Sequence, residues 1–173
     1  MSESGKQVQA RRIISSRFIV VVLAGMLSAC GFHLRGVAYL PPELQSIELQ
    51  ADSLSVNQVT QLRRNLEQAG ASLNDDGSAD RVQLSVAIRP LPDRNLADSR
   101  GSNTVVVRVS RELSYSLTSN EGERLVSQNT IQRQQDLTLD NNNPIGIEFE
   151  KESAIEKLDR ELIIQLVLLL EQF

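Results

Sequence analysis

The sequence has one cysteine, Cys30, and one histidine, His33, among its 173 residues. A single cysteine excludes an internal disulfide and any zinc site built from several thiolates. A single histidine excludes histidine-rich metal sites, and His33 lies three residues from Cys30, where we expect an exposed tether rather than a catalytic centre. The sequence contains neither a Gly-x-Ser-x-Gly string nor a P-loop. We therefore predict no metal, no other cofactor and no enzymatic activity.

Aromatic residues make up only 3% of the sequence, and tryptophan is absent. This scarcity argues against the aromatic platforms on which bases and sugars stack. Residues 30–173 contain 14 Lys and Arg against 21 Asp and Glu, which gives this part a net charge of −7. An acidic domain does not attract the phosphates of nucleic acids, so we predict no nucleic-acid partner. An anionic ligand would need a local group of cations.

The N-terminal segment, residues 1–29, has the organisation of a secretory signal. Residues 1–17 contain four Lys and Arg and one Glu, and residues 18–26 form an apolar run. That run is well short of the roughly 20 residues that span a bilayer. The small residues Ser28 and Ala29 follow, directly before Cys30. We predict that residues 1–29 are a signal peptide that is cleaved.

The string Leu27-Ser28-Ala29-Cys30 resembles the lipobox of bacterial lipoproteins. The resemblance implies a diacylglyceryl group on the Cys30 sulfur, cleavage before Cys30 and acylation of the new amino group. Each buried CH₂ contributes about 0.8 kcal/mol, and stable anchoring takes more than one acyl chain. Residue 31 is Gly, not the Asp that retains many such proteins in the inner membrane. The implied location is therefore the outer membrane, on its periplasmic side.

Residues 30–42 are expected to be a lipidated tether, and residues 43–173 to form one domain. Alternation of apolar and polar residues predicts strands at 46–50, 81–89, 104–118 and 124–139. Apolar residues at steps of three and four predict helices at 56–69 and 148–170. Pro90 and Pro92 should end the second strand, and a polar loop should follow over residues 93–103. Turns are expected at residues 120–123 and 140–144.

This order, β-α-β-β-β-α, predicts an α+β fold. We expect a two-layer sandwich in which both helices cover one face of a four-stranded, mostly antiparallel sheet. The other face should then be polar, with the side chains of Gln83, Ser85, Arg89, Arg108, Ser110 and Ser114.

Two features do not fit this pattern simply. Arg111 falls on the apolar phase of the third strand, where an unpaired guanidinium is costly, and we expect a bulge to turn it outward. A pair with Glu112 is disfavoured because neighbours in a strand point to opposite faces. Residues 162–170 are apolar on almost every side of the last helix. They are either clamped inside the fold, which we favour, or form an interface with a partner protein.

The string Cys30-Gly-Phe-His-Leu-Arg-Gly36, with the element order and mature length, resembles the LptE (RlpB-type) family of lipopolysaccharide-assembly lipoproteins. The resemblance implies a non-enzymatic protein that sits as a plug inside the LptD outer-membrane β-barrel. It also implies that the chain helps that barrel to assemble and binds lipopolysaccharide for insertion into the outer leaflet. Membrane attachment would be through the N-terminal lipid.

In that family, lipid A phosphates are assigned to a basic residue near the loop before the long strand and another near the start of the last helix. Arg100 lies nearest to the first position here, with Arg94 in the same predicted loop, and Lys151 lies nearest to the second. The resemblance therefore implies that these three residues bind phosphate. The alternative is that Arg94 and Arg100 are ordinary loop charges.

Two other functions stay open at the level of the sequence. The first is a lipid-anchored binding subunit of another envelope lipid-transport system, which could use the same kind of acylated α+β domain. The second is an envelope hydrolase with an unrecognised site, although groups suited to such catalysis are sparse. Membrane fractionation separates the first from an LptD partner, and turnover of an envelope substrate would indicate the second.

Overall fold

The computed structural model describes residues 39–73, 81–98 and 103–173. The expected signal peptide, Cys30, His33 and the tether as far as residue 38 lie outside these residues. Leu40 is buried, and its backbone N–H donates to the Ala69 carbonyl over 2.9 Å. A short 3₁₀ helix, η1, follows at Pro42–Leu44, and Leu44 is fully buried. The last residues of the expected tether are thus part of the packed body.

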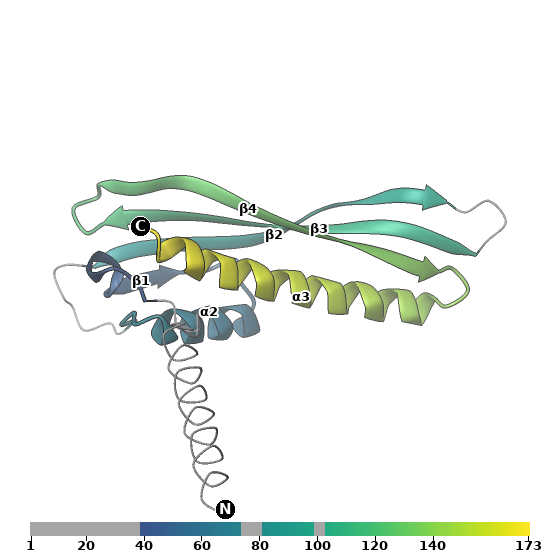
Figure 1. Cartoon of the computed structure of the whole chain (residues 1–173), viewed down its shortest axis with the longest axis horizontal. Coiled ribbons are helices and arrows are strands. Elements are labelled where there is room, and N and C mark those ends of the chain that lie inside the picture. The colour runs from purple at the N-terminus through teal and green to yellow at the C-terminus, as the bar shows by residue number, and fades with distance from the viewer. Residues whose placement is uncertain (1–38, 74–80, 99–102) are drawn as a thin grey trace, which may run out of the picture. The chain divides into compact units, whose positions relative to one another are not determined.

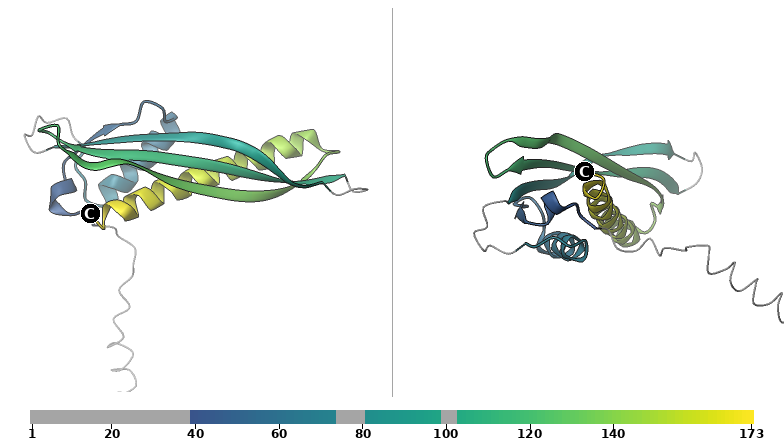
Figure 2. Two further views of the ribbon diagram at one scale, coloured as in Figure 1. Left: turned by 90° about the horizontal axis from the view of Figure 1, so that it is seen from above. Right: turned by 60° about the vertical axis from the view of Figure 1, so that its left-hand side comes forward.

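The fold is the predicted α+β arrangement (Figure 1). The sheet has the strand order β1-β2-β3-β4, and the strands span Ile47–Gln50, Val82–Asp98, Thr104–Ser119 and Arg124–Asp140. β1 pairs in parallel with β2, whereas the other two pairs are antiparallel. The helices α2 (Val56–Gln68) and α3 (Pro144–Leu170) lie on one face of this sheet, as Figure 2 shows from two further sides. We call the other face the open face.

Local sequence signals explain where both helices begin. Ser55 and Gln58 form a capping box at the start of α2, in which each side chain accepts a hydrogen bond from the other residue's backbone N–H. Gly70 follows this helix with a φ of 92°, a conformation that a residue with a Cβ rarely adopts. α3 begins at Pro144, four residues earlier than predicted, because Asn143 caps it through Gly146 N–H over 3.0 Å.

β2 is longer than the sequence predicted. The expected end at Pro90 and the expected loop over residues 93–103 were wrong as far as Asp98, and residues 99–102 lie outside the described part. β1 is so short that it pairs with β2 only from Val82 to Ser85, so the two prolines lie on a free edge that needs no N–H donor. An irregularity between Leu91 and Arg94 absorbs the second proline.

Two apolar clusters fill the space between the sheet and the helices. The larger one packs α2 and the C-terminal half of α3 on β1, β2 and β3, with Leu62, Leu84, Leu113 and Leu166 fully buried. The smaller one packs Leu158 and Ala154 on Val109 and Leu139.

The apolar end of α3 is clamped in the fold on one side only. Leu162, Ile163 and Leu166 are buried in the core, which confirms the clamped arrangement for one side of the helix. Ile164 and Leu168 lie on the other side and are 49% and 46% exposed. This leaves a partly uncovered apolar strip beside β4.

Candidate functional site

The open face carries a polar row that crosses three strands. Arg89 of β2, Glu112 of β3 and Gln132 of β4 are direct partners in the sheet register. The Arg89 Nε–H donates to Glu112 Oε1 over 2.7 Å, and the Gln132 amide donates to Glu112 Oε2 over 2.6 Å. These bonds, first that from Gln132 and then that from Arg89, lower the pKa of Glu112. Glu112 is therefore a nearly buried carboxylate that stays charged at neutral pH.

A second row crosses the same face nearer the start of α3. Arg108 donates two parallel hydrogen bonds to Asp136, over 2.7 and 2.9 Å. This pairing lowers the pKa of Asp136 and raises that of Arg108. Arg94 is the register partner of Arg108, so it lies on the open face as well, and it is exposed.

Lys151, another predicted phosphate ligand, lies on the helix side. Its ammonium group is 3.0 Å from Asp93 Oδ2, and both side chains are partly exposed. Asp93 and Arg94 are neighbours in β2 that point to opposite faces. The structure therefore brings Arg94 and Lys151 to the same end of the sheet but on its two sides. The third predicted ligand, Arg100, lies outside the described residues.

The predicted bulge at Arg111 is wrong. Arg111 keeps regular register with both neighbouring strands and points toward the helices. It donates to both Asp159 carboxylate oxygens over 2.7 and 2.9 Å, and the side chains are 11% and 8% exposed. Gln58 of α2 adds a 2.7 Å bond to Asp159. The expectation that Arg111 does not pair with Glu112 is confirmed, because Glu112 faces the open side.

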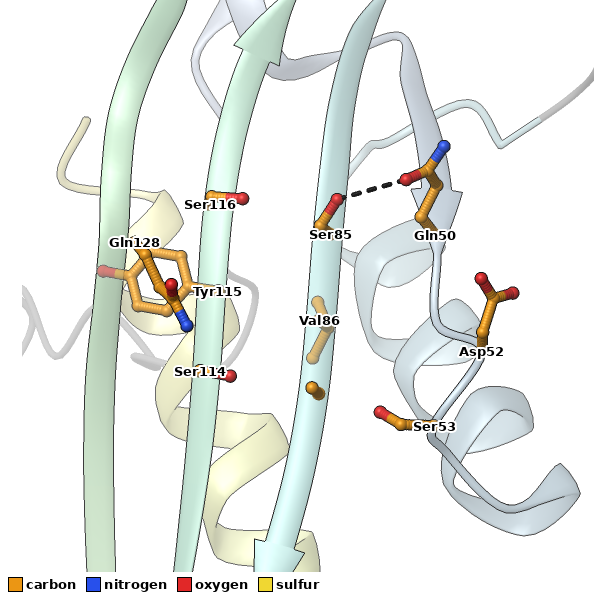
Figure 3. Close-up of a pocket in the computed structure, with 10 residues that line it drawn as sticks. Gln50, Asp52, Ser53, Ser85, Val86, Ser114, Tyr115, Ser116 and Gln128 are labelled. Atoms are coloured by element: carbon orange, nitrogen blue, oxygen red, sulfur yellow. Dashed lines mark hydrogen bonds between the residues drawn. The ribbon is translucent and has the colours of Figure 1, made fainter.

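A shallow depression of about 380 Å³ lies on the open face where β1 ends (Figure 3). Ser85, Ser114 and Ser116 line it, and Gln50 accepts a 3.3 Å hydrogen bond from Ser85. Asp52 lies at its rim, and none of the described residues that line it is Lys or Arg. It can exchange hydrogen bonds with a polar surface, but it lacks the cations that a phosphate group needs.

The described residues contain no group of three or more His, Cys, Asp or Glu side chains placed to hold a metal ion. No helix in this part of the chain is long and apolar enough to cross a membrane. The chemistry available on the open face is hydrogen bonding and ion pairing across a broad polar surface.

Sequence reasoning found the polar phase of the open face but missed its pairing. Arg89 and Arg108 were both expected there, yet Glu112, Gln132 and Asp136 were not singled out. The missing signal was strand register, because only register shows that an Arg and a carboxylate on different strands are opposite each other. Asp159 was missed because it lies on the buried side of α3, where the sequence pattern predicts apolar residues.

Comparison with protein families and with curated proteins gave no match for this chain. Comparison with solved structures found bacterial lipoproteins of the same fold. A minor lipoprotein from Acinetobacter baumannii has a TM-score of 0.54 and 18% identity, over 75% of this chain and 89% of that one. Uncharacterized lipoprotein B from Nitrosomonas europaea has a TM-score of 0.60 and 16% identity, over 80% and 88%.

Rare lipoprotein B from Shewanella oneidensis has a TM-score of 0.55 and 15% identity, over 73% of this chain and 91% of that one. Identities this low show a shared fold and nothing finer. The fold of the described residues is thus one that bacterial lipoproteins use, including two described as lipoprotein B.

Proposed function

We propose that this chain is a lipid-anchored lipoprotein of the outer membrane that plugs an LptD-type β-barrel and helps it to assemble. We further propose that it binds lipopolysaccharide for insertion into the outer leaflet and that it is not an enzyme. The observation that carries the proposal is the fold shared with the lipoprotein B structures, among which the Nitrosomonas protein has a TM-score of 0.60. The lipobox-like string ending at Cys30 adds the anchor.

The open face supports a role as a plug. The lumen of a large outer-membrane barrel is polar, so a plug needs a broad surface that keeps its charges satisfied. The two rows described above meet this need, because Glu112 and Asp136 are each held by an arginine of a neighbouring strand. Both carboxylates of these rows would therefore keep a charged partner inside a water-filled lumen.

Binding of lipopolysaccharide requires cations that can reach the lipid A phosphates. Arg94 is exposed, and its guanidinium can present two parallel N–H donors to a phosphate. Lys151 must exchange Asp93 for the phosphate, which costs little because exposed ion pairs contribute at most about 1 kcal/mol. These two residues are the described candidates for phosphate contact.

The test is purification of the full-length protein through a C-terminal tag from gently solubilised membranes. The expected result is one main partner, an outer-membrane barrel, whose folded amount falls when this chain is depleted. Mass analysis of the same material should show fatty acyl chains on Cys30. Recovery of a free monomer would contradict the proposal, and recovery with an inner-membrane carrier would favour another envelope lipid-transport system.

A further inference from the structure

The outer edge of β4 has no neighbouring strand in the described part of the chain. β4 pairs with β3 on one side only, so about half of its backbone N–H and C=O groups point outward. From Asn129 to Asp140 its register with β3 is unbroken, and this stretch contains no proline. An irregularity interrupts β4 only before Asn129.

The free edge of β2 differs in this respect. The pairing of β2 with β1 ends at Ser85. Beyond it, β2 contains Pro90, Pro92 and an irregular register, and these features disfavour pairing with another strand. The edge of β2 therefore disfavours pairing with another strand, whereas the regular part of the β4 edge can accept one.

A groove of about 610 Å³ runs beside the open edge, between β4 and α3. We call it the β4–α3 groove, and its lining includes Arg133 of β4 and Glu161, Ile164, Gln165 and Leu168 of α3. Ile164 and Leu168 are the half-exposed apolar residues on the outer side of α3. Their apolar surface faces the space that a strand added to β4 would fill.

Two buried amide oxygens of β4 and α3 accept no hydrogen bond from any residue that the structure describes. They are Oε1 of Gln165, which lines the groove, and Oε1 of Gln135, on the same face of β4 as Arg133. A buried acceptor without a donor costs about 1–3 kcal/mol, so the oxygen of Gln165, the residue of the two that lines the groove, favours an occupant that carries N–H or O–H groups. A hydrocarbon chain could fill the groove but would leave Gln165 Oε1 unpaired.

The charge on this face of β4 further limits which kind of molecule the β4–α3 groove can bind. Arg133 is exposed and forms no ion pair with a described residue. An antiparallel contact between the β4 strands of two copies, centred on Arg133, would place the two Arg133 side chains opposite each other, with Glu161 of each α3 as the carboxylate that lines the groove. A strand of different sequence can instead place a carboxylate opposite Arg133.

We propose that the β4–α3 groove binds an extended segment of another polypeptide, which adds to the edge of β4 as a fifth strand. On the groove side this segment carries an acidic residue facing Arg133 and apolar residues lying on Ile164 and Leu168. Main-chain hydrogen bonds along the regular edge hold the segment, and the groove selects its alternate side chains. This inference does not depend on the identity of the barrel partner.

The test uses the full-length lipoprotein in intact cells, with the photoreactive residue p-benzoyl-phenylalanine at one position at a time. Leu168 reports on the groove, Gln134 reports on the open-face side of the same edge, and Ile145, 85% exposed on α3, is the matched control. Cross-linked peptides are identified by mass spectrometry. We expect the first two probes to capture neighbouring residues of one short stretch of one other protein, and the third not to capture it.

A substitution completes the test. Ile164→Glu should lower the cross-link yield at Gln134 at least tenfold, whereas Ile145→Glu, the same change on the same helix, should leave it unchanged. Thermal unfolding checks that both variants are folded. Cross-links to a second copy, to lipid alone or to residues scattered over many proteins would overturn the proposal. So would the absence of a product at Leu168 or Gln134, or a cross-link yield that Ile164→Glu does not change.

Discussion

Arg111 shows how a charged residue is accommodated on the apolar phase of a strand. Its guanidinium and the Asp159 carboxylate are both nearly buried and form two parallel hydrogen bonds, and Gln58 supplies a third donor. A buried pair of this kind adds little net stability compared with apolar residues of similar volume. Breaking it is a different matter, because the remaining charge stays buried without a partner.

We therefore expect Arg111→Met to destabilise the protein by about 3–5 kcal/mol, since it leaves Asp159 uncompensated. Combining it with Asp159→Leu should recover most of this loss, because the pair is then replaced by apolar side chains. Urea unfolding followed by circular dichroism measures both changes. A double variant as unstable as the single one would contradict this account.

Glu112, on the opposite face of the sheet, makes the stability of the protein depend on pH. Its folded-state pKa lies below the ordinary 4.5 because Gln132 and Arg89 donate to the charged form. A lowered folded pKa means that the unfolded chain binds the proton more readily, so this stabilisation is complete above the unfolded pKa. It is lost as pH falls through the folded value.

The expected result is that the stability difference between wild type and Glu112→Gln shrinks as the pH falls below about 4.5, the ordinary value. Thermal unfolding between neutral and acidic pH measures it. Glu123→Gln, an exposed change in the β3–β4 turn, is the control and should show no comparable trend. A constant difference between wild type and Glu112→Gln across this range would contradict the role given to these hydrogen bonds.

At the scale of the elements, sequence patterns located the four strands and both long helices, although the apolar phase of the fourth strand is weak. They failed where the environment of an element decides its length. Pro90 and Pro92 end a central strand but not a strand with a free edge, and the shortness of β1 is what frees that edge. One sequence does not reveal the register between strands or which side of an element stays exposed. The ion pairs between strands and the β4–α3 groove could therefore not be predicted.

Gln58 illustrates the same limit at the start of α2, where it has two roles. Its side-chain oxygen completes the capping box with Ser55, and its amide nitrogen donates to Asp159 of α3. Local rules treat Gln and Glu as equivalent at this position of a capping box. The contact with Asp159 makes them different, because a Glu would place two carboxylates together.

Gln58→Glu should therefore destabilise the protein by more than Ser55→Ala, which should cost about 1 kcal/mol through loss of the cap alone. Its deficit should decrease in acid, because protonation of the introduced carboxylate removes the repulsion. Urea titrations at neutral and acidic pH compare the two variants. Equal and pH-independent losses would mean that the contact between α2 and α3 contributes nothing.

At the scale of the whole body, the chain enters the fold at one end and presents its candidate phosphate ligands at the other. Leu40 bonds to Ala69 at the end of α2, whereas Lys151 lies near the start of α3 and contacts Asp93, the neighbour of Arg94 in β2. The 27 residues of α3 separate the two ends by about 40 Å at 1.5 Å per residue.

The phosphate assignment can be tested without changing the lipobox-like string, because Arg94 and Lys151 lie far from residues 27–30 in the sequence. Lys151→Asp and Arg94→Asp should each weaken binding of purified lipopolysaccharide by more than Arg63→Asp on the exposed side of α2. Asp93→Asn should instead strengthen it, by up to about fivefold, because it frees Lys151 from an exposed ion pair worth at most about 1 kcal/mol. Titration of the detergent-solubilised lipoprotein measures all four affinities. If Asp93→Asn weakens binding, or if the three Asp variants lose equally, phosphate does not bind at this end of the body.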